Sequence, residues 1–461
     1  MTLNHYNNKK IEEGFIDLYT NSISRMKLPE NKLPEKASDP KVIRRMLYDE
    51  LFMDGNARQN LATFCTTYIE DEVRDLMDLS IDKNMIDKDE YPQTAEIEQR
   101  CVSILGNLWH SPEKSDTSGC STTGSSEAAM LGGLALKWQW RKRRIAEGKP
   151  ANNPNLVCGP VQICWHKFAR YFDVEIREVP LINDELGMIP EQLKDYCDEN
   201  TIGVVATLGS TFTCIYEPVQ QLADALDIIQ NETGFNIPIH VDAASGGFIA
   251  PFIHMDLKWD FCIPRVKSIN ASGHKYGMAP LGVGWVIWRT VAELPEELIF
   301  NVDYLGGQMP TFALNFSRPA GQIIAQYYNF LRMGREGYTA IQNDSAATAQ
   351  YLGEQLGKVD VLKILYNGMG GIPAVCYTLK DEDATGFSLY DLSDRLRIHG
   401  WQIASYPLPS NRQEITVQRI LIRRGVSHNM VLLLLRDLRR EVEYLKDNPV
   451  INRSKKVSFH H

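Results

Sequence analysis

The sequence lacks the features that mark membrane and secreted proteins. No apolar run approaches the ~20 residues that a membrane-spanning helix needs, and the longest leucine-rich run, 431–435, is followed at once by Arg436 and Asp437. This run is typical of a core-facing helix. The first residues contain no apolar segment of signal-peptide length, so we expect a cytoplasmic protein.

Paired cysteine motifs are also missing. The chain has nine cysteines, an odd number, and no two of them form a Cys-x-x-Cys pair. Several lie inside apolar runs, which indicates reduced, buried thiols and neither a disulfide framework nor a zinc site. We therefore expect no metal. The cysteines are residues 65, 101, 120, 158, 164, 197, 214, 262 and 376.

An excess of positive charge is absent as well. The formal net charge of −9 argues against nucleic acid as a partner. The densest basic run, Arg141 to Arg144, is typical of the solvated end of a long helix. There is no Gly-x-x-x-x-Gly-Lys-Ser/Thr loop and no Gly-x-Gly-x-x-Gly after a strand, so the nucleotide and dinucleotide classes lose support.

What the chain does contain is an alternation of apolar runs and helical patterns. Residues 1–57 form a polar, proline-containing arm. Residues 58–345 carry unbroken apolar runs at 155–159, 202–207, 237–241 and 283–288. Such runs, spaced by helices, predict a mainly parallel sheet covered by helices on both faces, an α/β fold.

The pattern changes after residue 345. A helix near 346–357, strands near 372–379 and 417–423, and a helix at about 428–446 predict a smaller α/β C-terminal domain over 346–461.

The most informative motif is Ser272-Gly273-His274-Lys275, read together with Asp242. Both Asp242 and Lys275 follow apolar runs. A lysine and an aspartate at the ends of nearby strands are what pyridoxal phosphate chemistry needs. The lysine forms an imine with the cofactor aldehyde, and the carboxylate keeps the pyridine nitrogen protonated. On these two residues alone, a loop lysine and a helix-capping aspartate explain the pattern equally well.

A possible phosphate site precedes this pair. Gly124-Ser125-Ser126-Glu127 stands before a helix-like stretch, and hydroxyls and free N–H groups at a helix N-terminus attract anions. Alone, the motif is typical of an ordinary helix cap. Followed by Asp242 and Lys275 in this order, it predicts a phosphate cup.

These motifs lie in a chain that closely resembles the bacterial glutamate decarboxylases, members of the pyridoxal-phosphate-dependent group II decarboxylases. The resemblance covers about Tyr48 to Asn448. Its long matches are Asp54 to Phe64, Gly159 to Tyr171, His240 to Gly247 and Asn301 to Gly307. It implies the type I pyridoxal-phosphate-dependent transferase fold, which is like that of aspartate aminotransferase.

The resemblance also implies roles for the cofactor residues. Lys275 is the imine lysine, Asp242 is the partner of the ring nitrogen, and Thr211 bonds the ring oxygen. Ala244 and Gln162 pack on the two ring faces. Gln162 stands where many group II decarboxylases have histidine, a departure shared with other glutamate decarboxylases. The phosphate ligands are Ser125, Ser126, His274 and, from a neighbouring subunit, Ser317, and Ser272 is a further cofactor-binding residue.

The substrate residues come from the resemblance too. Arg419 clamps the carboxylate that leaves, and Thr63 and Phe64 lie near the distal carboxylate. Asn84 and Asp87 are expected to reach that carboxylate across a subunit interface, although both also suit a loop cap before the next helix. An acid beside a carboxylate implies that one of the two is protonated, which suits activity at low pH.

The implied reaction removes carbon dioxide from L-glutamate and gives 4-aminobutyrate. It consumes a proton at Cα, with Lys275 and His166 as candidate donors, and such enzymes are associated with acid tolerance. The resemblance implies a homo-oligomer with a dimer as its minimal unit and a hexamer as its expected form. The N-terminal arm of relatives favours membrane association at acidic pH, whereas here docking on the core is the favoured interpretation of residues 11–27.

The C-terminal tail, 455–461, ends in His460 and His461. In the bacterial enzymes such a tail closes the active site near neutral pH, and an imidazole titrates in the right range to release it. A frayed terminus or a remnant of an expression tag is the alternative.

Two other functions stay open. One is a pyridoxal-phosphate-dependent decarboxylase for an aromatic amino acid or cysteine sulfinate; the other is a protein of this fold without turnover. A calmodulin-regulated enzyme of plant type is not expected, because the C-terminus lacks a tryptophan-bearing basic helix.

Overall fold

The computed structural model describes residues 31–449 except 114–116, 183, 303–308 and 410. The chain divides into two units, Met1–Asn56 and Ala57–His461. In the first unit, helix α2 (Pro40–Leu51) begins at a proline. The Asp39 side chain accepts a hydrogen bond from the Lys41 N–H at 2.7 Å, which satisfies one of the free donors of the first turn.

The second unit is built on a seven-stranded sheet with the order β1-β7-β6-β5-β4-β2-β3. Its strands β2 to β6 are parallel neighbours. The predicted apolar runs at 155–159, 202–207 and 237–241 correspond to β2, β4 and β5, so these predictions are confirmed. The strands are β1 (Gly119–Thr122), β2 (Asn155–Cys158), β3 (Glu175–Glu178), β4 (Thr201–Thr207), β5 (Ile239–Asp242), β6 (Val266–Ser272) and β7 (Gly284–Trp288).

The run predicted at 283–288 is also a strand, but its direction differs from the parallel pattern. Strand β7 is antiparallel to both β6 and β1. Parallel neighbours need a long crossover, usually a helix, whereas antiparallel strands can be joined directly. Only residues 273–283 connect β6 to β7, and they contain no described helix, so the chain returns antiparallel.

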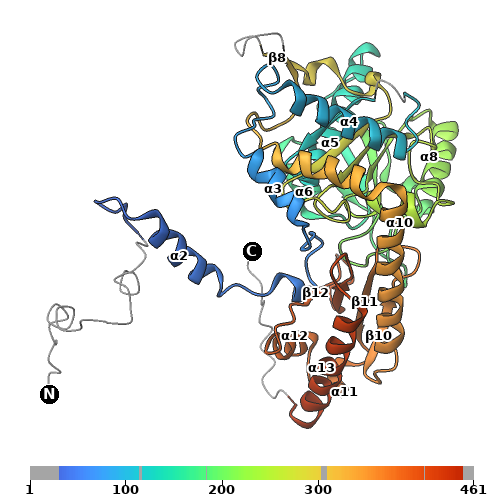
Figure 1. The fold of residues 1–461 in the computed structure, drawn as a ribbon. Helices are drawn as coiled ribbons and strands as arrows, with labels where there is room; N and C mark the ends of the chain where they lie inside the picture. The colour runs from blue at the N-terminus through green and yellow to red at the C-terminus, as the bar shows by residue number, and fades with distance from the viewer. Residues whose placement is uncertain (1–30, 114–116, 183, 303–308, 410, 450–461) are drawn as a thin grey trace, which may run out of the picture. The chain divides into compact units, whose positions relative to one another are not determined.

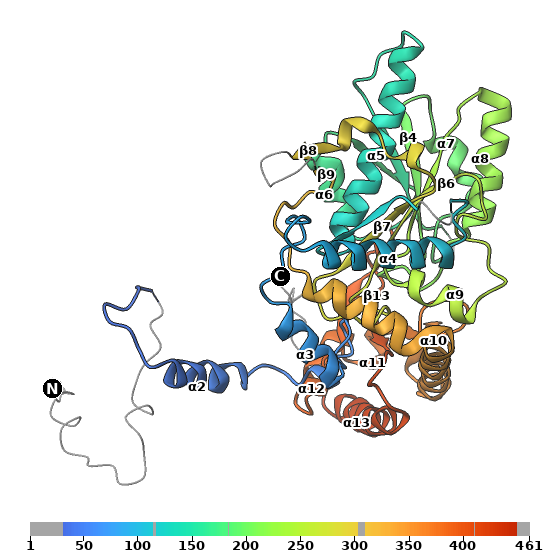
Figure 2. The ribbon, with the colours of Figure 1, turned by 45° about the horizontal axis from the view of Figure 1, so that its top comes forward.

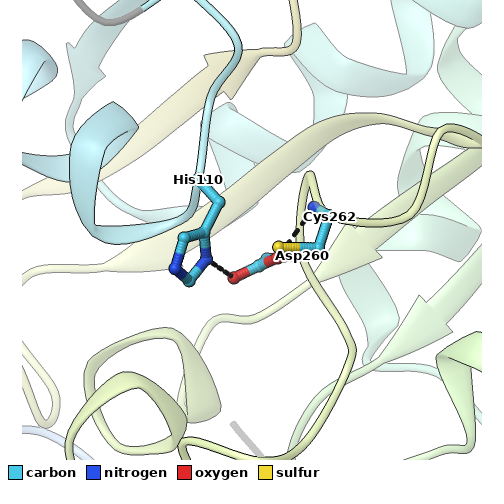
Figure 3. A group of neighbouring side chains, drawn as sticks. All are labelled: His110, Asp260 and Cys262. Atoms are coloured by element: carbon cyan, nitrogen blue, oxygen red, sulfur yellow. Dashed lines mark hydrogen bonds and ion pairs between the residues drawn. The ribbon is translucent and has the colours of Figure 1, made fainter.

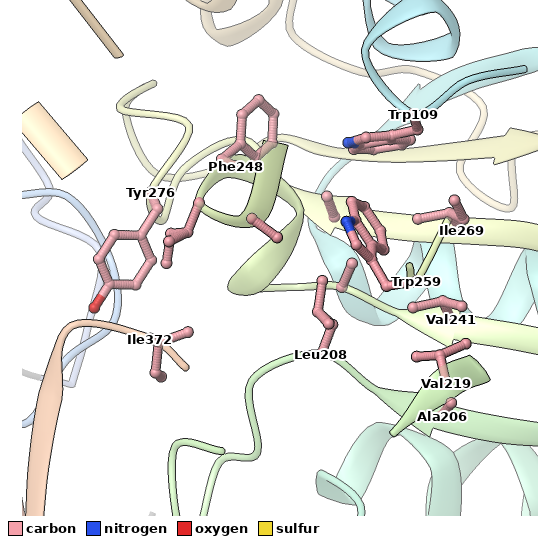
Figure 4. Close-up of a cluster of buried hydrophobic side chains, with 14 of the residues drawn as sticks. Trp109, Ala206, Leu208, Val219, Val241, Phe248, Trp259, Ile269, Tyr276 and Ile372 are labelled. Atoms are coloured by element: carbon pink, nitrogen blue, oxygen red, sulfur yellow. The ribbon is translucent and has the colours of Figure 1, made fainter. Parts of the chain in front are cut away.

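Helices cover both faces of this sheet, as predicted. Alternate residues of one strand belong to different hydrophobic clusters: Val204 packs with residues of α4 and α8, whereas Val205 packs with α5 and α6. Since successive strand side chains point to opposite faces, α4 and α8 cover one face and α5 and α6 the other. Figure 4 shows part of the first cluster around Trp109, Val241 and Ile269. The helices are α4 (Pro92–Leu108), α5 (Ser125–Ala146), α6 (Ile163–Tyr171) and α8 (Val219–Thr233).

A second sheet follows, with four antiparallel strands in the order β10-β11-β13-β12. Apolar side chains of α10, α12 and α13 pack against it. The strands predicted near 372–379 and 417–423 are β11 and β13, and the helix predicted at 428–446 is α13. The elements are β10 (Leu362–Tyr366), β11 (Ala374–Leu379), β12 (Ala404–Pro407), β13 (Thr416–Leu421), α12 (Leu389–Arg397) and α13 (His428–Asp447).

Helix α10 (Gly321–Leu356) links the two sheets. It packs against α4 and then, beyond Gly334, runs beside β10 and β11 (Figures 1 and 2). Gly334 has φ 55° and ψ −170°, so the helix changes direction there. The predicted helix at 346–357 is the end of α10, and the predicted boundary between 345 and 346 falls inside this helix. The division into a large and a small domain stays a prediction.

The remaining elements are short. They are α3 (Asp71–Leu79), α7 (Leu193–Tyr196), α9 (Ala250–Ile253), α11 (Glu382–Thr385), β8 (Phe300–Val302), β9 (Met309–Thr311) and the 3₁₀ turns 57–59, 190–192, 246–248, 291–293 and 296–298. Within the described ranges, every helix is too short or too polar to span a bilayer. All nine cysteines are free thiols.

Candidate functional site

The sheet brings Asp242 and the lysine motif to the same edge. Asp242 is the last residue of β5, and Lys275 follows the last residue of β6, Ser272, by three positions. Strands β5 and β6 are adjacent and parallel, with Asp242 opposite Asn270. The carboxyl ends of parallel strands are where α/β proteins commonly bind their ligands. The strand-end placement predicted for Asp242 is confirmed.

The Asp242 carboxylate is buried and held by neutral donors. Its Oδ2 accepts a hydrogen bond from the Trp165 indole N–H at 2.8 Å, and its Oδ1 accepts from the Asn270 amide at 3.0 Å and from the Ala244 N–H at 3.2 Å. Within the described part of the chain, no lysine or arginine lies within ion-pair distance of Asp242. A fixed, buried carboxylate of this kind suits a protonated pyridine nitrogen.

A second layer of hydrogen bonds fixes Asn270. Because the Asn270 amide nitrogen donates to Asp242, its Oδ1 is free to accept from His240 Nε2 at 2.7 Å. His240 Nδ1 then accepts from the Ser268 hydroxyl, also at 2.7 Å. Burial lowers the pKa of His240, although Asn270 and Asp242 oppose the shift, so the imidazole is neutral and has one N–H to donate.

The residues of the predicted phosphate cup lie at the start of α5. Helix α5 begins at Ser125 after Gly124, and the Ser272 hydroxyl donates to the Ser125 hydroxyl at 2.7 Å. The backbone is very close here: a Cβ on Gly284 would lie 2.3 Å from the carbonyl carbon of Gly124. The free N–H groups of a 22-residue helix and the adjacent hydroxyls suit a phosphate group.

His274 lies beside this helix start. A Cβ on Gly124 would lie 3.3 Å from His274 Cε1, and His274 Nδ1 accepts the Val283 N–H at 3.2 Å. Burial, and then the neighbouring Lys275, lower the pKa of His274 to about 4. The imidazole is therefore neutral at pH 7, with its Nδ1 as acceptor and its Nε2 as donor. That donor suits a phosphate oxygen.

Burial also lowers the pKa of Lys275. Arg419 adds to this effect, whereas Asp242 and the thiols Cys65 and Cys164 oppose it. A lowered lysine pKa increases the fraction of neutral amine, which is the nucleophilic form. The Lys275 Nζ lies 4.9 Å from the centre of the Phe64 ring.

Arg419 also contacts the phenyl ring of Phe64. Its guanidinium carbon is 4.2 Å from the centre of the Phe64 ring and 5.4 Å from that of Tyr406. The guanidinium donates to the backbone carbonyls of Thr211 and Ala62. Its buried Nε has no hydrogen-bond partner, and no carboxylate of the described residues lies within ion-pair distance. A buried guanidinium of this kind suits the carboxylate of a ligand.

Three predicted residues make local contacts. The Gln162 side chain accepts from the Cys164 N–H at 2.6 Å and caps α6. His166 Nε2, on the same helix, lies 3.6 Å from a carboxylate oxygen of Glu178. The Thr63 hydroxyl accepts from the Cys65 N–H at 3.1 Å.

A second group of predicted residues lies together elsewhere in the chain. The Asn84 amide donates to the Ser317 hydroxyl at 3.3 Å, and the Asp87 N–H donates to the Asn84 carbonyl at 3.2 Å. Among the described contacts of one chain, no hydrogen bond or ion pair joins these three residues to Lys275 or Arg419. His460, His461 and the segment 303–307 lie outside the described residues.

Sequence reasoning gave no role to four residues around the site: Trp165, His240, Asn270 and Tyr406. Trp165 and His240 lie inside stretches that match the family, so the sequence marks them as family positions. It does not show which residues they bond to. Asn270 precedes Ser272 by two positions on β6, which places both side chains on one face. Its pairing with Asp242 depends on strand register, which the sequence does not reveal.

Comparisons with known proteins identify the family of the chain. The model of the pyridoxal-dependent decarboxylase conserved domain matches residues 33–380. The chain belongs to this family, and pyridoxal 5'-phosphate is its cofactor.

Individual relatives match over nearly the whole chain. The chain is 58% identical to a glutamate decarboxylase of Aliivibrio fischeri over 97% of its own length and 96% of the relative's. It is 46% identical to glutamate decarboxylase beta of Listeria innocua, over 96% of each chain. The solved structure of a Lactobacillus brevis glutamate decarboxylase, also 46% identical, superposes with a TM-score of 0.89 over 94% of this chain and 98% of that one. The type I fold predicted from the sequence is confirmed.

Proposed function

We propose that the protein removes the α-carboxyl group of L-glutamate and releases 4-aminobutyrate and carbon dioxide. One observation carries the proposal: the buried Arg419 guanidinium, without a carboxylate partner among the described residues, shares the Phe64 ring with the strand-end Lys275. The identity of the substrate is inferred from the relatives named above. They are glutamate decarboxylases, and this chain matches them over nearly their full lengths.

The cofactor, when bound, supplies an aldehyde for the substrate amine and an electron-accepting ring. Lys275 would hold the aldehyde, and Asp242 would hold the ring nitrogen. Ser125, Ser126, Ser272 and His274 would surround the phosphate. These residues fit the group because a neutral imidazole, hydroxyls and helix N–H groups meet at the start of α5.

Three further side chains complete the proposed cofactor site. Gln162 and Ala244 would pack on the two ring faces, and Thr211 would bond the ring oxygen. The Ala244 N–H donates a hydrogen bond to Asp242, the proposed partner of the ring nitrogen. The Thr211 carbonyl accepts a hydrogen bond from Arg419, so a proposed cofactor residue and a proposed substrate residue are in direct contact.

Arg419 determines which carboxyl group leaves. A guanidinium can hold a carboxylate through two parallel hydrogen bonds, which fixes the plane of that group. Loss of carbon dioxide requires the breaking bond to stand upright to the ring, and a clamped α-carboxylate can be held in that orientation. Thr63 and Phe64 belong to the same segment as Ala62, whose carbonyl accepts from Arg419, so we assign them to the substrate.

The proton balance follows from the reaction. Cα loses carbon dioxide and gains a proton from the protein, which the solvent then replaces, so each turnover consumes one proton. Lys275 is one proposed donor, since its lowered pKa favours release of a proton. His166 is the other; its imidazole lies 3.6 Å from Glu178 and is 39% exposed.

We infer a site shared between subunits of a homo-oligomer, with a dimer as the minimal unit and a hexamer expected. Asn84, Asp87 and Ser317 lie together on one chain without a hydrogen bond to that chain's Lys275 or Arg419 among the described contacts. Because the three residues are hydrogen-bonded to one another, we infer that one neighbouring subunit contributes all of them. Asn84 and Asp87 would reach the distal carboxylate of the substrate, and Ser317 would reach the phosphate of the cofactor.

We further propose a cytoplasmic enzyme that supports acid tolerance and is not regulated by calmodulin. The nine free thiols support a reducing compartment. Membrane association of the N-terminal arm at acidic pH is part of the same proposal. His460 or His461 would close the site near neutral pH, and deletion of 455–461 tests this idea. An unchanged pH–activity curve after the deletion would refute it.

A substrate panel tests the main proposal. The holoenzyme is incubated with glutamate, aspartate, cysteine sulfinate, tyrosine or tryptophan between about pH 4 and 7, and released carbon dioxide is measured, with Lys275→Ala as the control. We expect release from glutamate alone, and none from the variant. Preferred release from another amino acid would support the alternative decarboxylase, and no release from any would support a protein without turnover.

A further inference from the structure

A group of three potential metal ligands lies far from Lys275. His110, in the loop after α4, places its Nδ1 2.7 Å from Oδ2 of Asp260, and Cys262 lies in the same loop as Asp260, before β6 (Figure 3). One ligand atom from each of the three side chains lies within 4.8 Å of the other two. Among the described residues, no other group of three His, Cys, Asp or Glu side chains meets this criterion.

The two loops are fixed by buried contacts. The Phe261 N–H donates to the carbonyl of Trp109 at 3.2 Å, which ties one loop to the other next to the ligands. The Trp109 and Trp259 rings pack edge to face at 6.3 Å, and the Arg289 guanidinium donates to the Phe261 carbonyl at 2.6 Å. The ligand-bearing backbone is therefore held in place without a metal.

Asp260 is the centre of the group. Its side chain is only 5% exposed, and its Oδ1 accepts from the Cys262 N–H at 2.9 Å. One carboxylate oxygen of Asp260 is therefore bonded to His110, and the other is bonded to the backbone of Cys262. The Cys262 thiol lies against the same carboxylate and adds a sulfur ligand beside an oxygen and a nitrogen.

We propose that His110, Asp260 and Cys262 form a binding site for a borderline-soft divalent cation, Zn²⁺ in particular. Zinc binds histidine nitrogen, carboxylate oxygen and cysteine sulfur at about 2.0–2.3 Å and accepts three protein ligands with water in the fourth position. Ligand atoms around such an ion lie about 3.5 Å apart. To bind the ion, the distance between His110 Nδ1 and Asp260 Oδ2 must increase by less than about 1 Å. Rotation of the imidazole, which is 64% exposed, allows this change.

The site lies at the opposite edge of the sheet from Lys275. Asp260 and Cys262 precede β6, whereas Lys275 follows it, and a seven-residue strand is about 20 Å long. A cation here would cross-link the end of α4 to the start of β6 without touching the cofactor residues. The inference is independent of the proposed function, since binding can be measured whether or not the protein decarboxylates glutamate.

Cation binding is measured on the full-length holoprotein. The tail histidines could also bind zinc, so His460→Gln/His461→Gln serves as the reference protein. After treatment with a chelator, it is titrated with Zn²⁺ by calorimetry in a non-thiol reductant, and separately with Co²⁺, whose absorption reports thiolate ligation. We expect about one Zn²⁺ per chain and a cobalt–thiolate charge-transfer band.

Substitutions assign the ligands. Cys262→Ser should abolish the cobalt–thiolate band, and both Cys262→Ser and His110→Ala should weaken Zn²⁺ binding at least about tenfold. Cys197→Ser and His428→Ala are matched controls: Cys197 is a partly exposed thiol and His428 an exposed imidazole, both outside the group. His110 is mostly exposed, so His110→Ala keeps the test valid if Cys262→Ser fails to fold. Unchanged Zn²⁺ affinity in His110→Ala, or absence of the cobalt–thiolate band in the reference protein, would overturn the proposal.

Discussion

Asn270 donates its side-chain amide to the Asp242 carboxylate at 3.0 Å, and this bond fixes the proposed partner of the cofactor ring. Asn270→Ala would remove the bond and leave the His240 N–H without its acceptor. A buried hydrogen bond to a charged group contributes about 1.5–3 kcal/mol. We therefore expect kcat to fall about 10- to 100-fold and cofactor affinity to weaken, as measured by steady-state kinetics and cofactor titration.

Ser268→Ala is the control for this prediction. It removes the other partner of His240 but keeps the bond between Asn270 and Asp242. We expect a much smaller decrease in kcat and in cofactor affinity than for Asn270→Ala. Equal losses in both variants would indicate general loosening of the core and contradict a positioning role for Asn270.

The second prediction concerns Arg419. Lysine retains the charge but cannot form two parallel hydrogen bonds to one carboxylate, so Arg419→Lys should lower kcat/KM for glutamate about 10- to 100-fold. Arg424→Lys is the matched control, because Arg424 lies close by in sequence and is paired with Glu70 at 2.6 Å. Steady-state kinetics decides. Similar losses in the two variants would argue against a substrate clamp at Arg419.

The third prediction is a pH dependence of stability in the cofactor-free protein. The pKa of His274 is about 4 in the folded chain and ordinarily 6.5. Between these pH values the unfolded chain binds more protons, so His274 makes the fold less stable as the pH falls from about 6.5 to 4. The gap corresponds to about 3 kcal/mol at ~1.36 kcal/mol per pKa unit.

His274→Asn isolates this contribution. Urea unfolding of both apoproteins at fixed protein concentration gives the free energy of unfolding at each pH. The wild-type value minus the variant value should decrease by up to about 3 kcal/mol between pH 7 and pH 4. A difference that is the same at every pH would show that His274 is not neutral in the folded chain.

The fourth prediction tests the shared site. Chains carrying Lys275→Ala are co-expressed with chains carrying Asn84→Ala and Ser317→Ala. If Asn84 and Ser317 serve the neighbour's site, mixed dimers contain one intact site, and random pairing restores up to about a quarter of the activity. If they serve their own chain's site, no activity returns.

A second mixture controls for this result. Lys275 and Asp242 lie at the same edge of one sheet, so mixing Lys275→Ala with Asp242→Asn chains should restore no sites. Recovery of activity in this control mixture would mean that activity returns by a route other than the sharing of Asn84 and Ser317 between subunits.

The sequence predicted those parts of the fold that depend on local patterns. Continuous apolar runs indicated β2, β4 and β5, and motifs at the ends of strands indicated Asp242 and Lys275. The start of α5 at Ser125 was visible from its glycine and its hydroxyls. In each case the signal lies within a few neighbouring residues.

Features that depend on register or on connections were not predictable. The direction of β7 follows from the short link after β6, and an apolar run has no direction of its own. Asn270 and Asp242 are 28 positions apart, and Asn84 and Ser317 are 233 apart. Their contacts arise from strand pairing and from loop packing, which no local pattern encodes.

The central claim is that Arg419 and Lys275 direct loss of the α-carboxyl group of glutamate. Glutamate labelled with ¹⁴C either at the α-carboxyl carbon or at the distal carboxyl carbon tests it most directly. We predict that labelled carbon dioxide comes only from the first substrate and that the second yields labelled 4-aminobutyrate. Release of label from the distal carboxyl, or from neither position, would contradict the account.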